Sequence, residues 1–569
     1  MTTTPMPGRG ERRAAAAGVV AAAAWIALCA RWFDGPHRGA TLLRIPPLLL
    51  ALVLLAAGLA WLAARRAPLL AMVATGSPGK LGLAVALAFA FRLPLAWHGG
   101  AGYVTSDGAL SGIVALRIRD GLGHLVFVPH VPYSGSLKSH LAAALGLFVD
   151  LPRAFALASV LFYCLFVAAA FLLAERAWRR SDLALAAGLY LAFAPVFVTR
   201  YSLSNDGNYV EVLALGSAAL LAVVVWDEDR ARLALPVLAG LLLGLAFWCH
   251  ILAVIHAAAA ALFLLGARRA AAPALLRLPG GFALGYAPGL LWNGANGWAS
   301  FHYLLPGGPA VEGAAATPLY RRAWALLSDH AVVLAGYDPG YGDAADLALR
   351  VAAVAALAAV AWAFVRSRGA ISGSPALRAV LLLALVNVVV AATALPHIPG
   401  NPRYLLFSIL TVAVLLARIA AERWGRPLLA VLVVAGALGS WAQARGTLRA
   451  DAQWRRFVAD LEAEGVRWCY TDFFLATKIN FLSGERVVCS AKLGPTITEY
   501  FYDYRSTVDA APAAALVAVN GTAAEKLERR LDRLGVTYER RDLMKPVLLR
   551  LSRKVDVAEI FPGRDFPLR

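Results

Sequence analysis

Long apolar blocks constrain this chain more than any other feature of its 569-residue sequence. About thirteen occur, most with the roughly 17–22 residues that a helix needs to cross about 30 Å of hydrocarbon. Hydrophobic residues make up 60% of the chain and charged residues 16%, against about 45–50% and 25% in soluble proteins. We therefore expect a mostly α, polytopic membrane helix bundle and not a soluble enzyme. The expected spans are 14–32, 46–64, 80–97, 153–174, 182–199, 209–226, 233–249, 250–266, 278–293, 344–365, 377–395, 403–420 and 427–443.

Basic residues gather in the short loops between these blocks and orient the chain. With the amino terminus inside, every expected cytoplasmic loop is basic, as the positive-inside rule requires. The clusters are Arg65, Arg66 and Lys80; Arg176, Arg179 and Arg180; Arg230 and Arg232; Arg268, Arg269 and Arg277; Arg366, Arg368 and Arg378; and Arg423 and Arg426. Topology thus explains the net charge of +19, and nucleic-acid binding is not expected. The basic start runs directly into an apolar block, which we interpret as a retained first helix and not as a cleaved signal peptide.

The odd number of spans places four main segments outside: loops 98–152 and 200–208, the stretch 294–343 and the chain after 443. The last of these gains charge and alternates helical with strand patterns, which is typical of a small α/β domain. We expect two N-terminal membrane helices (1–79), a membrane core (80–443) and an extracytoplasmic α/β domain (444–569). That domain should contain helices over 451–465, 473–484 and 522–535 and strands over 466–472, 485–490, 515–520, 536–541 and 546–552.

The five cysteines show no metal-ligand spacing. Cys29, Cys164 and Cys249 lie in apolar blocks, where we interpret them as small core residues. Cys469 and Cys489 share the expected outer domain, so they could form a disulfide there.

The loop 98–152 is too long for a simple connector, and loops of this length are usually functional. Leu110, Ile113, Val114 and Ile118 are spaced as on one face of a helix, which predicts an amphipathic helix in the membrane interface. Asp107 then lies at the start of this helix. It could cap the helix by accepting backbone N–H groups, or it could act as a general base toward an acceptor hydroxyl. A second apolar piece, LAAALGLFV, is too short to span the membrane.

The motifs of this loop resemble the first external loop of GT-C superfamily membrane glycosyltransferases. They are SDGALSGIVALRIRDG and PYSGSLKSHLAAALGLF, and GLLLGLAFW, GFALGYAPGLLWN, PRYLLF and FLSGERVV follow in the order of that family. The chain resembles in particular the bacterial GT-C enzymes that are similar to protein O-mannosyltransferases and aminoarabinose transferases. The resemblance implies an inverting transferase that takes a sugar from a polyprenyl-phosphate carrier on the outer face of the cytoplasmic (inner) membrane. The acceptor would be a lipid, a glycan or a protein.

The resemblance also implies site residues. Asp107 matches the catalytic carboxylate, but Gly108 follows it where many relatives have a second acidic residue. The next external loop offers Asp206, our second catalytic candidate, and Glu211, a candidate for substrate binding. An ordinary Asn-Asp-Gly turn would also explain Asp206.

Cations near the outer ends of the spans are candidates for the leaving phosphate. We favour Arg403, which follows a Pro-Gly-Asn-Pro turn, although snorkelling to lipid headgroups would also explain it. Arg200, Lys138 and Arg92 are weaker candidates. Lys138 departs from relatives that carry an acidic residue after GSL. Among the outer aromatic residues, Tyr133 is a candidate for stacking on a sugar.

Histidines leave the question of a metal open. His124, His130, His140, His302 and His397 all fall in external loops, and their spacing fits no standard ligand set. Some GT-C relatives use a divalent cation and others do not, so a cation is possible and no cofactor is certain. We interpret His250 and His256, within apolar blocks, as hydrogen-bonded residues between helices.

A polytopic transporter or lipid flippase is the alternative function. Transporters carry ionisable residues inside spans and broken helices in two similar halves. No such halves are evident here, and the span interiors are almost free of strongly polar groups apart from Arg92, His250, His256 and Asn387. An inactive assembly partner with the same scaffold would share this hydropathy, and only activity separates it from an enzyme.

Overall fold

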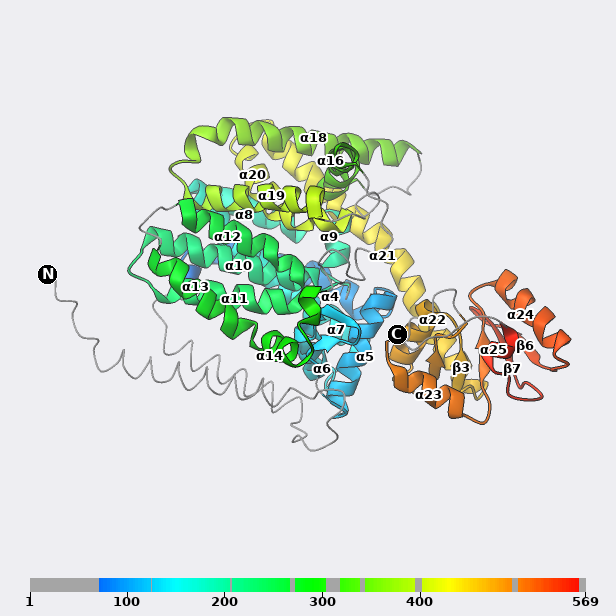
Figure 1. Ribbon diagram of the computed structural model, residues 1–569. Helices are drawn as coiled ribbons and strands as arrows, with labels where there is room; N and C mark the ends of the chain where they lie inside the picture. Colours follow the sequence, from blue (N-terminus) through cyan, green and yellow to red (C-terminus); the bar gives the residue numbers. More distant parts are fainter. Residues whose placement is uncertain are drawn as a thin grey trace.

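The computed structural model describes residues 71–123, 125–204, 207–266, 272–302, 318–337, 343–394, 402–493 and 500–561. Helices dominate it and form a layered bundle, from which one long helix, α21, leads to a small α/β domain (Figure 1). The mostly helical fold with a small C-terminal sheet confirms the expected fold class. The expected spans 14–32 and 46–64 lie outside the described residues.

Seven helices in the described part of the chain are long and apolar enough to cross a membrane. They are α4 (Pro78–Gly99), α7 (Leu151–Trp178), α10 (Tyr209–Glu228), α18 (Asp343–Ser367), α19 (Pro375–Ala394), η5 with α20 (Pro402–Ser408 and Ile409–Ile419) and α21 (Gly425–Ala463). Other helices of the bundle are shorter: α8 (Ser181–Ala192), α9 (Val196–Tyr201), α11 (Ala234–Cys249), η1 (Ile251–Ala253), α12 (Val254–Gly266), α13 (Ala272–Gly285), α14 (Ala287–Ala295), α15 (Ala299–His302), α16 (Leu319–Ala325), η3 (Leu326–His330), α17 (Ala331–Ala335) and η4 (Arg368–Ala370). The total of about thirteen spans stays a prediction.

The expected division between spans 233–249 and 250–266 is confirmed. Helix α11 ends at Cys249, and His250 has extended backbone, with φ −161° and ψ 138°. The short helix η1 and then α12 follow. The break brings the His250 side chain to the end of the bundle where the first external loop packs, since Ser134 forms a β-bridge with His250.

Glycines bring α11 and α13 into backbone contact. A Cβ atom on Gly240 or Gly244 of α11 would lie 2.1–2.2 Å from a carbonyl oxygen of α13. Gly281 and Gly285 of α13 approach carbonyls of α11 equally closely. Close packing through small residues is a common way for membrane helices to associate, because lipid provides no hydrophobic drive between them.

The external loop folds into helix α5 (Ser106–Arg119), the hairpin β1 (Phe127–Val128) and β2 (Val131–Gly135), and helix α6 (Leu137–Leu145). The helix expected after Asp107 is present, but its expected amphipathic character is wrong, because every residue of α5 from Gly108 to Leu116 is buried. Its place in the membrane interface stays a prediction. It packs against α6 and α7 and, across from them, against the C-terminal domain.

The C-terminal domain carries a five-stranded sheet in the order β4-β3-β5-β7-β6. Strand β3 is parallel to β4 and β5, and β7 is antiparallel to β5 and β6. Its elements are β3 (Trp468–Tyr470), α22 (Phe473–Leu482), β4 (Val488–Ser490), α23 (Tyr502–Ala510), β5 (Ala515–Val517), α24 (Gly521–Arg533), β6 (Glu539–Asp542), β7 (Pro546–Leu549) and α25 (Val557–Ile560). Every strand and helix expected after residue 466 is present, whereas α23 and α25 were not expected.

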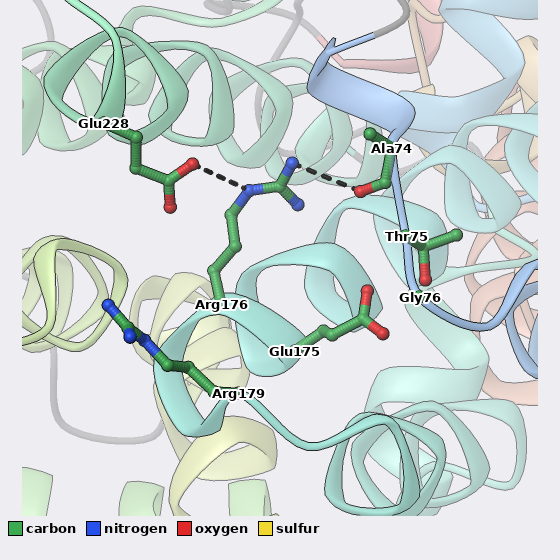
Figure 2. A pocket seen from close by; sticks show the side chains of 7 residues that line it. All are labelled: Ala74, Thr75, Gly76, Glu175, Arg176, Arg179 and Glu228. Carbon is green, nitrogen blue, oxygen red and sulfur yellow. Dashed lines mark hydrogen bonds and ion pairs between the residues drawn. The ribbon is translucent and has the colours of Figure 1, made fainter.

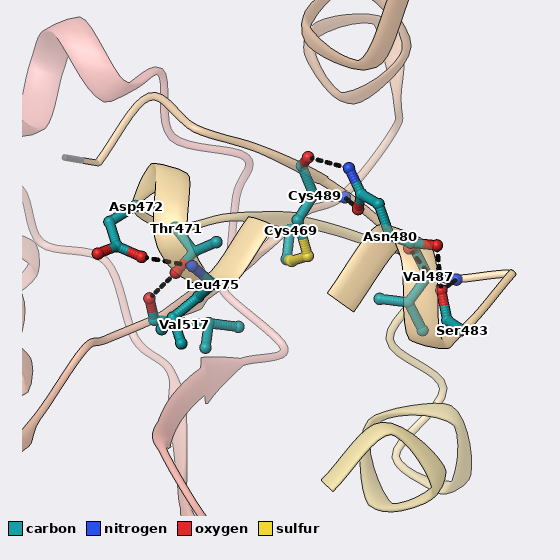
Figure 3. Close-up of a disulfide and its surroundings, with 9 residues drawn as sticks. All are labelled: Cys469, Thr471, Asp472, Leu475, Asn480, Ser483, Val487, Cys489 and Val517. Carbon is teal, nitrogen blue, oxygen red and sulfur yellow. Dashed lines mark hydrogen bonds between the residues drawn. A yellow bond between two sulfur atoms is a disulfide. The ribbon is translucent and has the colours of Figure 1, made fainter. Parts of the chain in front are cut away.

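A disulfide joins Cys469 of β3 to Cys489 of β4, as the sequence allowed (Figure 3). Asn480 of α22 secures this pair of strands, because its amide donates to the Cys489 carbonyl at 2.9 Å and accepts from the Cys489 N–H at 2.7 Å. Both cysteines are fully buried.

Helix α21 has 39 residues and crosses the expected domain boundary at 443/444 without a break. The expected span 427–443 and the expected helix 451–465 are therefore one element. The membrane core and the C-terminal domain share a continuous helix, and no flexible linker lies between them.

Candidate functional site

Asp107 lies in the first turn of α5, and its side chain is exposed. The N-cap of this helix is Thr105, whose hydroxyl accepts from the Gly108 N–H at 3.1 Å. The capping role considered for Asp107 therefore belongs to Thr105. A carboxylate in the first turn interacts favourably with the positive end of the helix dipole.

The hairpin that follows α5 brings Tyr133 to the break between α11 and α12. The Tyr133 ring lies 5.5 Å from the His250 ring, and the His250 ring lies 5.2 Å from that of Tyr209, the first residue of α10. His250 Nδ1 accepts the Leu252 N–H at 3.1 Å, which holds the imidazole in place. Val128 of the same hairpin packs in the hydrophobic cluster of α5, so the helix of Asp107 and the strand of Tyr133 form one unit.

Arg403, at the start of η5, stacks on this group of rings. Its guanidinium carbon lies 5.8 Å from the centre of the Tyr209 ring and 5.2 Å from that of Tyr404. One Nη2 bond to the Tyr404 hydroxyl, at 3.4 Å, is long. Arg403 Nε is buried and has no hydrogen-bond partner among the described residues. A buried N–H group without a partner is costly, and an anionic ligand would satisfy it.

We call this group the aromatic–arginine cluster; its members are Tyr133, Tyr201, Tyr209, His250, Arg403 and Tyr404. The Tyr201 ring joins it at 5.6 Å from that of Tyr209. The structure therefore brings together two sequence candidates, Tyr133 and Arg403, which lie 270 residues apart. A cation surrounded by aromatic rings at the end of a helix bundle suits a phosphate attached to an apolar or sugar group.

Lys138 of α6 and Glu211 of α10 form a buried ion pair. Lys138 Nζ lies 2.6 Å from Glu211 Oε1, and the side chains are 1% and 0% exposed. Neither charge reaches solvent, so neither meets a substrate unless the pair separates. Their role as substrate-binding residues stays a prediction.

The other cationic candidates are Arg92 and Arg200, which lie on either side of Tyr201, since Arg92 binds Ser202 and Arg200 precedes Tyr201 in α9. Arg92 is fully buried and donates to the carbonyl of Ala192 at 2.7 Å and to the hydroxyl of Ser202 at 2.7 Å, so it holds the end of α8. Arg200 is exposed at the end of α9. Asp206 lies outside the described residues.

Histidines form no metal centre in the part of the chain that the structure describes, where no three His, Cys, Asp or Glu side chains gather. His124 and His397 lie outside that part. His250 is hydrogen-bonded, but its partner is the Leu252 N–H of its own segment and not a residue of another helix. For His256 the expected hydrogen bond is wrong: both ring nitrogens are buried without a partner among the described residues, because the ring packs on Phe407 and against Gly216.

A cavity of about 480 Å³ lies at the other end of the bundle. Figure 2 shows the residues that line it. Its lining includes Glu175, Arg176 and Arg179 at the end of α7 and Glu228 at the end of α10. Because the cluster lies at the beginning of α10, a helix of about 30 Å separates the two sites. Arg176 is already engaged, with Nη2 donating to the Ala71 carbonyl at 2.9 Å. We therefore do not assign this cavity to the candidate site.

Asn208 was missed by the sequence reasoning and joins three elements of the site. Its amide donates to the carbonyls of Gly135 (2.8 Å) and Cys249 (3.0 Å) and to the hydroxyl of Ser134 (3.2 Å). The backbone φ of 54° is the left-handed conformation that Asn tolerates better than most residues. The signal in the sequence was the run Asn-Asp-Gly-Asn, in which Asn208 follows the candidate Asp206 by two residues.

Comparisons with known proteins agree with this architecture. No protein-family model matches the chain, and no curated protein matches it in sequence. Among solved structures, ArnT from Cupriavidus metallidurans bound to undecaprenyl phosphate matches with a TM-score of 0.55 and 14% identity, over 83% of this chain and 98% of that chain. The apo oligosaccharyltransferase of Archaeoglobus fulgidus matches with a TM-score of 0.45 and 14% identity, over 78% of this chain and 69% of that chain. The likeness to ArnT confirms the GT-C fold that the sequence motifs predicted.

Proposed function

We propose that this membrane protein of GT-C fold is an inverting glycosyltransferase, which moves a sugar from a polyprenyl-phosphate donor to an acceptor. The observation that carries the proposal is Arg403, whose buried Nε has no hydrogen-bond partner among the described residues, in an aromatic cluster at one end of the bundle. ArnT, a solved structure with this fold, is bound to undecaprenyl phosphate, a polyprenyl phosphate of the kind that would leave in the proposed reaction.

In the proposed reaction an acceptor hydroxyl attacks the anomeric carbon of the donor sugar. The new C–O bond forms as the bond from that carbon to the phosphate oxygen breaks, and polyprenyl phosphate leaves with the electron pair. Asp107 takes the proton of the hydroxyl, as a carboxylate acting as general base does. Arg403 stabilises the charge that develops on the phosphate. Asp206 is the second candidate for the base.

The basic loops support placement of this reaction on the outer face of the cytoplasmic membrane. The aromatic–arginine cluster lies at the ends of α10 and α11 that are opposite to the basic clusters around Arg179 and Arg230. If those clusters face the cytoplasm, the candidate site and the C-terminal domain face outward. The acceptor is then a lipid, a glycan or a protein of the cell envelope.

The test compares envelope glycans by mass spectrometry in a deletion strain that carries wild type or variants at matched membrane levels. We expect one sugar to disappear in the deletion and to return with the wild type. Asp107→Asn should lower its transfer by about 10²–10⁴-fold, because loss of a general base costs that much. Arg403→Gln should lower it as well, because the leaving phosphate loses its cation.

Asp120→Asn is the matched control, since Asp120 ends the same helix and pairs with Arg119 at its surface. It should transfer as the wild type does. Full activity of both Asp107→Asn and Arg403→Gln would contradict the proposed site, and an unchanged glycan profile in the deletion strain would contradict the proposed function.

A further inference from the structure

Helix α5 is held between two parts of the chain that are far apart in sequence. On one side it contacts α6 and α7 of the membrane core. On the other side it contacts α22 of the C-terminal domain, more than 350 residues later (Figure 1). A helix with both sides buried takes its position from both neighbours, because packed interiors leave few alternative arrangements.

The middle of α5 fits against the C-terminal domain without a gap. A Cβ atom on Gly112 would lie 2.6 Å from ring atoms of Phe481, so only glycine allows this approach. The Phe481 ring also packs edge-on against Phe155 of α7, with ring centres 6.1 Å apart. Phe481 therefore fills the space between α5 and α7.

The end of α5 is fixed by Arg117. Its Nε and Nη2 donate to Glu485 Oε1 at 3.2 and 3.1 Å, and Nη2 donates to Asp503 Oδ2 at 2.6 Å. The guanidinium also lies over the rings of Phe501 (4.5 Å) and Tyr504 (5.1 Å). The planar guanidinium binds two carboxylates and stacks on two aromatic rings at the same time, which fixes its orientation. A lysine ammonium could not make the same set of contacts.

Tyr504 strengthens this contact, because its hydroxyl donates to the same Glu485 carboxylate. Burial and the adjacent carboxylate raise the pKa of the Tyr504 hydroxyl, so it stays a donor at neutral pH. The Arg117 and Glu485 side chains are 19% and 20% exposed, which limits screening by salt.

A second contact holds the segment that leads into α5. The Ala101 N–H donates to Asp451 Oδ1 of α21 at 2.7 Å. Asp451 Oδ2 in turn accepts from Arg455 at 2.7 Å. Asp107 thus lies between two anchored residues, Ala101 before it and Arg117 after it, and both contact the chain beyond residue 443.

We propose that Arg117 is a positioning residue: through it the C-terminal domain sets the place of α5 and therefore of the Asp107 carboxylate. This inference rests on the proposed function, because it assumes that Asp107 acts on substrate. Of the proposed donor contacts, Arg403 lies on η5 and Tyr209 on α10, and only Tyr133 of β2 belongs to the unit that contains α5. Loss of Arg117 should therefore lower turnover much more than it lowers donor binding.

The experiment uses the full chain in nanodiscs and in the complemented deletion strain. Arg117→Met should raise hydrogen–deuterium exchange over residues 106–119 by about tenfold or more, because local opening becomes easier. It should lower envelope glycan transfer by about 10–100-fold, since a misplacement of about 1 Å can cost 10²-fold. The affinity for undecaprenyl phosphate, used as the binding probe, should stay within about twofold of the wild type.

Arg119→Met is the matched control, because Arg119 lies on the same turn and pairs with the neighbouring Asp120. It should change none of the three measurements. Asp503→Asn removes one arm of the contact at a half-exposed partner and should shift exchange in the same direction by less. This second variant keeps the test valid if Arg117→Met fails to reach the membrane.

Wild-type exchange over 106–119 in both Arg117→Met and Asp503→Asn would overturn the inference, and so would increased exchange with full transfer. Failure of the proposed function gives a different result. In that case Asp107→Asn also leaves the glycan unchanged, and the exchange data alone decide whether the C-terminal domain holds α5.

Discussion

Lys138 and Glu211 place two opposite charges in a site with almost no exposed area. Beyond their mutual contact, Lys138 Nζ and both Glu211 carboxylate oxygens have no hydrogen-bond partner among the described residues. The penalty for removing two charges from water is large, and a single ion pair often fails to offset it. The pair therefore contributes little to the free energy of unfolding. Removing one of the two side chains, however, would leave the other charge buried without a partner.

We expect Lys138→Met or Glu211→Leu alone to lower the free energy of unfolding by about 3–5 kcal/mol, because the remaining charge is buried without a partner. The double variant Lys138→Met/Glu211→Leu should recover most of that loss. Thermal unfolding of the purified protein in detergent, followed by tryptophan fluorescence, measures all three. A double variant as unstable as either single variant would show that the pairing is not the source of the effect.

The sequence allowed individual residues of the candidate site to be predicted, but not the contacts between them. Arg403 and Tyr133 could be proposed because they stand near expected span ends in motifs of a known family. Their contact through Tyr209 and His250 could not be predicted, because it depends on how the helix breaks at His250 and on the turn at Asn208. Burial of Lys138 was equally hidden, since its partner Glu211 is 73 residues away.

At the scale of elements, the contact between α11 and α13 is specified by glycines. Gly281 faces α11, where a Cβ atom would lie 2.1 Å from the Val237 carbonyl oxygen. The adjacent Gly280 has open space, with no heavy atom within 4 Å of such a Cβ. The two glycines differ only in the side of α13 on which they lie.

We predict that Gly281→Ala destabilises the protein by about 1–3 kcal/mol, the usual cost of overpacking. Gly280→Ala should be neutral or slightly stabilising, because alanine has the higher helix propensity. Melting temperatures of the two variants, measured in the same detergent, check this. Equal melting temperatures would mean that α11 and α13 do not pack as closely as described.

The local pattern of apolar and polar residues predicted where helices and strands lie better than it predicted which other elements they pack against. The C-terminal strands and the helices α22 and α24 lie where alternation and apolar spacing placed them. Helix α23 was missed because its sequence, YDYRSTVDA, is mostly polar and has no apolar spacing. Helix α5 was predicted as an amphipathic helix with one face open, because its partner α22 follows so much later in the sequence that its burial on that side could not be foreseen.

At the scale of the molecule, α21 fixes how the C-terminal domain meets the membrane core. Its 39 residues span about 58 Å, whereas the hydrocarbon core of a bilayer is about 30 Å thick. A large part of the helix therefore extends beyond the membrane, and Gly102 packs directly on its Thr447. The orientation of the domain is transmitted by this helix.

One alanine inserted between Arg445 and Gly446 should rotate the C-terminal domain by about 100° about α21. The contacts of Asp451 and of Arg117 would then be lost together, and exchange over residues 106–119 should rise more than in Arg117→Met. An alanine inserted between Pro512 and Ala513, both exposed in a loop of the same domain, serves as the control. If both insertions leave α5 equally protected, α21 does not set the orientation of the domain.

The disulfide between Cys469 and Cys489 has a consequence for biogenesis. Both sulfurs are buried once the domain has folded, so oxidation must occur before or during folding. If the C-terminal domain holds α5 and faces outward, both as proposed, a newly made chain becomes active only after this domain has been exported and oxidised. Assembly of the membrane core alone would then yield a dormant protein, and the oxidising compartment would act as a checkpoint on its maturation.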